Sequence, residues 1–110
     1  MIDWKRVSDL RSEIGAAEFD EVVELFLDEV ETLLARLKDE PKPELFEEDL
    51  HFLKGCAVNL GFSDLARLCL QGETRAHRGE ADTVDLEPIF SCFDASRVIF
   101  FDGVAAGLAA

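Results

Sequence analysis

One long series of apolar residues with helical spacing constrains the fold of this chain more than any other feature. Acidic residues lie between its members, so the opposite face of a helix here would contact water. An α-helix turns about 100° per residue, and residues three and four apart therefore form one stripe. We predict a long amphipathic helix over about residues 16–39. Its apolar members are Phe19, Val22, Val23, Phe26, Val30, Leu33, Leu34 and Leu37.

Shorter series of the same kind predict four more helices, at about residues 3–14, 44–60, 63–78 and 85–107. Glycine or proline marks several of the breaks: Gly15, Pro41-Lys42-Pro43 and Gly61. No segment shows the alternation that is typical of a β-strand. The expected fold is all-α, an antiparallel up-and-down four-helix bundle. The short additional N-terminal helix, 3–14, is expected to lie across the bundle as a lid.

Length and charge exclude several classes of function. The 110 residues suffice for a single domain, which we expect to span residues 1–110. A net charge of −13 argues against binding to nucleic acid or to anionic membranes, because both attract Lys and Arg. The chain lacks a run of about 18 apolar residues, and its first residues lack the apolar stretch of a secretion signal. We therefore expect a cytoplasmic protein.

The predicted helix 44–60 carries an exposed histidine with two informative neighbours. Its apolar stripe includes Leu50 and Leu53, and His51 points about 150° away from that stripe. Lys54 and Gly55 follow His51 at i+3 and i+4, so both are its neighbours on the helix surface. Glycine inside an exposed helix costs about 1 kcal/mol relative to alanine. Its presence there indicates the close approach of another molecule.

These residues resemble a known family signature, that of the histidine-containing phosphotransfer (HPt) domains of multistep two-component phosphorelays. The similarity begins with the run His51-x-Leu53-Lys54-Gly55. It continues through small residues at Cys56 and Ala57, then Leu60-Gly61, Leu65 and Leu68-Cys69. The surrounding helical pattern extends the resemblance over nearly the whole chain. Gly72 departs from the family pattern, in which a larger apolar residue is usual.

The resemblance implies that His51 accepts a phosphoryl group from an aspartate of one response-regulator receiver domain and passes it to another. An upstream hybrid sensor kinase would be a further partner. In such relays the receiver supplies the divalent metal, so the chain is expected to need no cofactor and to hold no metal of its own. We expect a phosphocarrier and not a kinase, because the chain has no glycine-rich nucleotide loop and no room for an ATP-binding domain.

The resemblance and the helical positions together assign roles to the residues around His51. Lys54 is expected to pair with phosphoryl oxygens, or alternatively with a nearby acid. Gly55 is expected to leave room for the phosphorylated aspartate of the partner. Val58 and Phe62 are expected to add an apolar rim to the docking surface, with packing beneath the first helix as the alternative.

Two glutamates are candidates for orienting the imidazole of His51. Glu47 lies one turn before His51 on the same helix, and Glu73 lies roughly level with it on the next helix. Either one is expected to accept a hydrogen bond from one ring nitrogen, unless both are ordinary surface acids. His77 has no comparable neighbours and is expected to be structural or to face solvent.

Two other functions remain open from the sequence. The chain could be an interaction module in which His51 is incidental. A metal-binding helical bundle would use Glu48 and His51, but His51 points outward and the Glu-x-x-His spacing occurs only once. A monomer is expected, with a dimer through the apolar last helix as the alternative.

Overall fold

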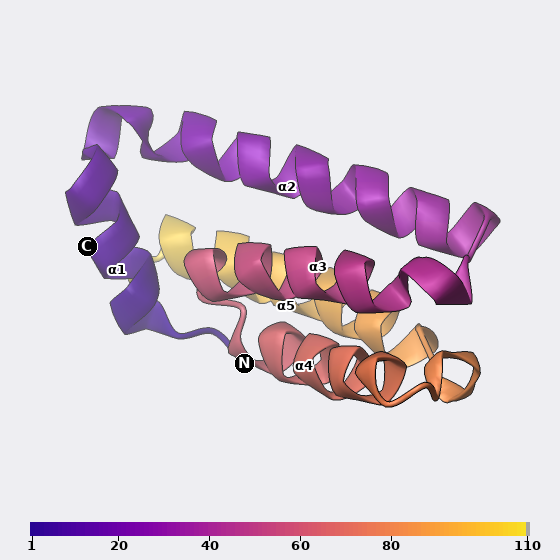
Figure 1. The fold of residues 1–110 in the computed structure, drawn as a ribbon. Coiled ribbons are helices and arrows are strands. Elements are labelled where there is room, and N and C mark those ends of the chain that lie inside the picture. The colour runs from indigo at the N-terminus through magenta and orange to yellow at the C-terminus, as the bar shows by residue number, and fades with distance from the viewer. Residues whose placement is uncertain (110) are drawn as a thin grey trace.

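A computed structural model describes residues 1–109, and the part described is all-helical (Figure 1). It confirms the predicted all-α class. The only β-type pairing in this range is an isolated bridge between Ile2 and Phe62. None of the helices in this range has both the length and the apolar character needed to cross a membrane. The five α-helices are α1 (Trp4–Ile14), α2 (Ala16–Asp39), α3 (Phe46–Leu60), α4 (Ser63–His77) and α5 (Glu87–Ala105).

Four of the helices run lengthwise along a molecule that measures 42 × 22 × 21 Å, and α1 crosses one end of them (Figure 1). α3 and α4 pack against each other most extensively of any two elements. α2 contacts α3, and α4 contacts α5. The α3–α4 interface is therefore the most extensive one between two helices, and it holds the residues around His51 in place.

The helix boundaries follow local signals, with small differences from the predicted ranges. α2 has the predicted bounds, and Gly15, with a φ of 88°, separates it from α1. α3 starts two residues later than predicted, because the chain first forms a 3-10 turn over Pro43–Leu45. α5 starts at Glu87 and not at residue 85. The Asp85 carboxylate instead accepts a hydrogen bond from the Glu87 N–H at 3.1 Å.

Gly61 ends α3 and is required there for two separate reasons. Its φ of 76° lies in the left-handed region, which favours glycine. The Asp3 N–H also donates to the Gly61 carbonyl oxygen at 2.7 Å, so the chain entering α1 lies directly against this turn. A Cβ at Gly61 would lie 2.7 Å from the carbonyl oxygen of Asp3. The turn thus fixes both the α3–α4 connection and the position of α1.

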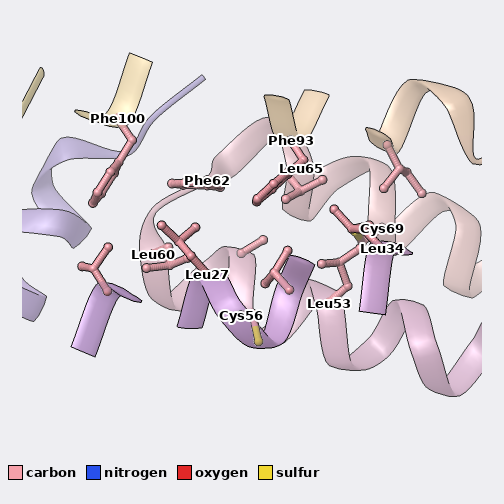
Figure 2. Close-up of a cluster of buried hydrophobic side chains, with 14 of the residues drawn as sticks. Leu27, Leu34, Leu53, Cys56, Leu60, Phe62, Leu65, Cys69, Phe93 and Phe100 are labelled. Atoms are coloured by element: carbon pink, nitrogen blue, oxygen red, sulfur yellow. The ribbon is translucent and has the colours of Figure 1, made fainter. Parts of the chain in front are cut away.

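Phe62 follows this turn and is one of the central residues of the core (Figure 2). Its side chain is fully buried, and its ring centroid lies 5.4 Å from that of Phe100 and 6.4 Å from that of Phe93. The prediction that Phe62 contributes to an exposed rim is therefore wrong. The alternative prediction, packing beneath the first helix, is closer to the structure, since Phe62 pairs with Ile2 in the segment before α1.

Candidate functional site

His51 projects from the outer face of α3, where 70% of its side chain is exposed. The ring nitrogen Nδ1 lies 2.5 Å from Oε2 of Glu73 on α4. The other carboxylate oxygen of Glu73, Oε1, accepts a hydrogen bond from Nζ of Lys54 at 2.6 Å. One glutamate from α4 therefore contacts both the histidine and the lysine of the predicted site.

Glu73 is ionised at neutral pH in this arrangement. Its side chain is only 14% exposed, and this burial on its own raises the pKa of the carboxyl. The hydrogen bonds and charges of Lys54 and His51 outweigh the effect of burial, so the pKa of Glu73 is lowered from its ordinary value. An ionised carboxylate only accepts hydrogen bonds, so Nδ1 of His51 must be the donor. In the neutral ring, the lone pair is then on Nε2.

The helix surface next to His51 is open. A Cβ placed on Gly55 would meet no other atom within 4 Å. Val58 is on the same face of α3 and is 54% exposed. A second molecule therefore has access to the His51 ring across the position of Gly55.

Glu47 does not contact His51. Its carboxylate instead lies 2.8 Å from Nδ1 of His77, at the C-terminal end of α4. The prediction offered Glu47 and Glu73 as alternatives, and the structure places only Glu73 at the ring of His51. The two helices run in opposite directions, so Glu47 faces a residue four positions beyond Glu73.

Two cross-helix pairs thus form a ladder along the α3–α4 interface. Each pair joins an imidazole on one helix to a carboxylate on the other, and the pairs lie one helical turn apart. The sequence signal for the second pair was the i, i+4 spacing of Glu47 and His51 on α3, repeated by Glu73 and His77 on α4. The imidazole of His77 is exposed, and its glutamate is about half exposed.

Gly72, the departure from the family pattern, lies inside this interface. It is buried, and α4 continues through it without a break. A Cβ at this position would lie 2.6 Å from Cδ1 of Leu50 on α3. Leu50 is the residue before His51, and Gly72 is the residue before Glu73. The two helices therefore pack closely next to the His51–Glu73 pair.

On its other side, α3 is joined to α2 by an ion pair that the sequence analysis missed. Nη2 of Arg36 donates to Oδ1 of Asp49 at 2.5 Å, and this hydrogen bond, opposed by burial, raises the pKa of Arg36. Asp49 is 9% exposed although it is charged. Its position next to Leu50 in the apolar stripe was the signal for this pair. The pair joins α2 to the side of α3 that lies away from His51.

The part of the chain that the structure describes contains no group of three or more His, Cys, Asp or Glu side chains arranged to hold a metal ion. The candidate site consists of the exposed imidazole of His51, the largely buried carboxylate of Glu73 and the ammonium of Lys54. Its chemistry is that of a nucleophilic nitrogen with a fixed proton on the opposite side of the ring.

Comparisons with known proteins agree with the family that the sequence motif resembles. The family model described as the Hpt domain matches residues 21–100. The chain is also similar to two curated proteins named phosphorelay protein LuxU, from Vibrio vulnificus strains YJ016 and CMCP6. Each is 31% identical over 84 residues, which cover 74% of this chain and 73% of the relative. No solved structure gives a significant match.

Proposed function

This chain belongs to the Hpt domain family, and on that premise we propose that His51 is the residue through which it carries phosphoryl groups. The chain is a phosphorelay intermediate, as its family and its similarity to the LuxU phosphorelay proteins indicate. One observation supports the choice of His51 above all. Its ring is exposed, and Glu73 holds the Nδ1 proton, which leaves Nε2 with a free lone pair.

The transfer step follows from this arrangement. The lone pair of Nε2 attacks the phosphorus of a receiver aspartyl phosphate. An N–P bond forms, the P–O bond to the aspartate breaks, and the electron pair of that bond leaves with the aspartate carboxylate. The ring keeps its Nδ1 proton and becomes a phosphorylated imidazolium. The adjacent negative charge of Glu73 stabilises the positive charge that develops on the ring. The reverse sequence passes the group to a second receiver.

Lys54 and Gly55 have complementary parts in this proposal. Lys54 lies one turn along α3 from His51, and its ammonium is held near the site by Glu73. When the phosphoryl group adds about two negative charges, Lys54 can move from Glu73 to the phosphoryl oxygens. Gly55 leaves the approach to Nε2 open, and exposed Val58 adds apolar surface for docking.

The partners of the chain follow from its place in a phosphorelay. They are receiver domains of response regulators and an upstream hybrid sensor kinase, and the receiver supplies the divalent metal. The chain itself acts as a phosphocarrier, without a kinase domain or a cofactor, and works in the cytoplasm as a monomer. Helices α2 to α5 form the antiparallel four-helix bundle of this family, with α1 as the lid.

The direct test is incubation with receiver domains that carry a radiolabelled aspartyl phosphate. We expect the chain to acquire a label that is lost in acid and stable in alkali. His51→Gln should abolish labelling but retain receiver binding, whereas His77→Gln, at the other cross-helix pair, should label normally. A label that persists in His51→Gln would contradict the proposal. Normal signalling by His51→Gln in cells would instead indicate an interaction module.

A further inference from the structure

The contact between Gly72 and Leu50 lies directly below the polar pair of the site. Leu50 is fully buried, and Gly72 is buried on the facing helix. Each of these residues is joined through one peptide bond to a member of the His51–Glu73 pair. Any change in the separation of α3 and α4 at this level therefore acts directly on the distance between Nδ1 and the carboxylate.

A larger residue at Gly72 would overlap the end of the Leu50 side chain. A Cβ there would lie 2.6 Å from Cδ1 of Leu50, whereas ordinary contacts of a Cβ are 3.4–4 Å. A second neighbour, Cγ1 of Val84, would lie at 3.4 Å, so the added methyl group also has little freedom on that side. The Leu50 side chain has no exposed surface into which it can turn. Either the end of the Leu50 side chain shifts or the two helices move apart by roughly 1 Å, and the enclosed position of Leu50 favours movement of the helices.

A separation of that size matters at the site because the hydrogen bond there is short. Nδ1 of His51 and Oε2 of Glu73 are 2.5 Å apart. An increase of roughly 1 Å would bring this distance to the limit at which a hydrogen bond is lost. The Lys54–Glu73 contact of 2.6 Å crosses the same interface and would lengthen with it.

We infer that Gly72 is a positioning residue: by admitting Leu50, it brings α4 close enough for Glu73 to hold the Nδ1 proton of His51. The inference rests on the proposed function for its consequence in phosphotransfer, but its geometric part does not. Glycine is a poor helix former, so local helix stability does not explain its presence in the middle of α4. Close approach of the two helices does.

The test is Gly72→Ala, observed by nitrogen-15 NMR of the neutral imidazoles at alkaline pH. The chain has only two histidines, and His77→Gln assigns their signals. We expect the ratio of the two neutral tautomers of His51 to move by about tenfold toward the form without a proton on Nδ1, the effect of losing one charge-assisted hydrogen bond. Transfer from a phosphorylated receiver should slow by several-fold.

Leu50→Val provides the rescue. It removes the methyl group that the new Cβ would meet, so Gly72→Ala/Leu50→Val should regain the wild-type His51 spectrum and transfer rate. Leu50→Val alone should leave the spectrum unchanged. If Gly72→Ala does not fold, the double variant alone decides, because it should fold and show the wild-type spectrum. Gly55→Ala, in which the added Cβ meets nothing, is the matched spectroscopic control in the free protein.

Two outcomes would overturn the inference. One is a folded Gly72→Ala protein with an unchanged His51 spectrum, which would show that Leu50 absorbs the methyl group. The other is a displaced spectrum that persists in the double variant. Failure of the proposed function is recognised separately, as a wild-type protein that takes no label on His51 although its spectrum shows the Nδ1 proton in place.

Discussion

Replacing Glu73 by glutamine is expected to redistribute the proton between the two nitrogens of the His51 ring. The substitution keeps the size and shape of the side chain and removes only its charge. Nδ1 of His51 then donates to a neutral amide oxygen in place of a carboxylate, across a contact that is 2.5 Å long in the wild type. The tautomer with a free Nε2 should become less populated, and transfer to His51 should slow.

The size of this effect follows from the burial of the two partners. A hydrogen bond to a charged group contributes about 1.5–3 kcal/mol, and a neutral one about 0.5–1.5 kcal/mol. Glu73 is largely buried but the His51 side chain is 70% exposed, so the lower half of each range applies. The difference is about 1 kcal/mol, which corresponds to about a fivefold change in the tautomer ratio. The transfer rate should fall by no more than this factor.

The assay compares nitrogen-15 shifts of the two imidazoles in the wild type and in Glu73→Gln. Glu47→Gln is the matched control, because Glu47 contacts the imidazole of His77 at 2.8 Å in the same cross-helix manner. Glu73→Gln should displace the His51 signals alone. Glu47→Gln should displace only those of His77 and leave the rate of phosphotransfer unchanged.

A Glu73→Gln protein whose His51 tautomer ratio equals that of the wild type would refute this role of Glu73. Displacement of the His51 signals by Glu47→Gln would also refute it, since the register of the two helices would then differ from the one described. A tenfold or larger loss of rate with an unchanged tautomer ratio would show that Glu73 acts on Lys54 or on the docked receiver.

Four further predictions concern the same region. Lys54→Met should slow transfer to His51 about tenfold, as expected for loss of one charged hydrogen bond to the phosphoryl group, and a rate within twofold of the wild type would exclude that role. Gly55→Leu should leave the free energy of unfolding in urea equal to that of the wild type or higher, since the added Cβ meets nothing. It should nevertheless slow transfer from a receiver at least about tenfold, because the larger side chain displaces the reacting groups. An unchanged transfer rate would show that no partner approaches at this position. Gly61→Ala should lower the free energy of unfolding by about 2 kcal/mol, because it combines a left-handed φ with a Cβ 2.7 Å from the Asp3 carbonyl oxygen, and urea titration measures this directly. The pKa of Glu73 is lowered in the folded state, so its ionised form stabilises the fold at a pH above the ordinary pKa of 4.5. The difference in free energy of unfolding between the wild type and Glu73→Gln should therefore shrink as the pH falls below 4.5. A difference that grows in this range would contradict the direction of the pKa shift.

Helical periodicity made most of the fold predictable. The apolar series predicted α2 because its members recur at the three- and four-residue spacing of one helix face and no competing pattern interrupts them. The differences lie at the helix ends, where single hydrogen bonds decide. The 3-10 turn at Pro43 and the Asp85 contact with the Glu87 N–H are local choices that periodicity does not determine.

The position of His51 was predictable from helix geometry, but its partner was not. Glu47 and Glu73 were both within reach by residue counting, and the choice depends on how closely α3 and α4 approach each other. That distance is set by the contact between Gly72 and Leu50. A sequence pattern shows that both residues face inward, but it does not show that they meet.

Phe62 was misassigned because a residue in a turn has no helical face from which its direction can be predicted. Its side chain could point to solvent or to the core, and only the tertiary packing decides. In the structure it lies against Phe93 and Phe100 of α5. The rings of α5 could not be placed opposite Phe62 from the sequence, because Phe93 and Phe100 lie more than 30 residues further along the chain.

The ladder of two imidazole–carboxylate pairs has a consequence for the alignment of α3 and α4 along their length. If α4 slipped by one turn in one direction, His51 would face His77, and Glu47 would have no partner. A slip by one turn in the other direction would place Glu47 opposite Glu73, two negative charges side by side. Only the observed alignment gives each imidazole a carboxylate. The polar residues around the reactive nitrogen therefore also disfavour the two nearest misaligned arrangements of α3 and α4. The uniform apolar stripes beneath these residues do not distinguish one alignment from another.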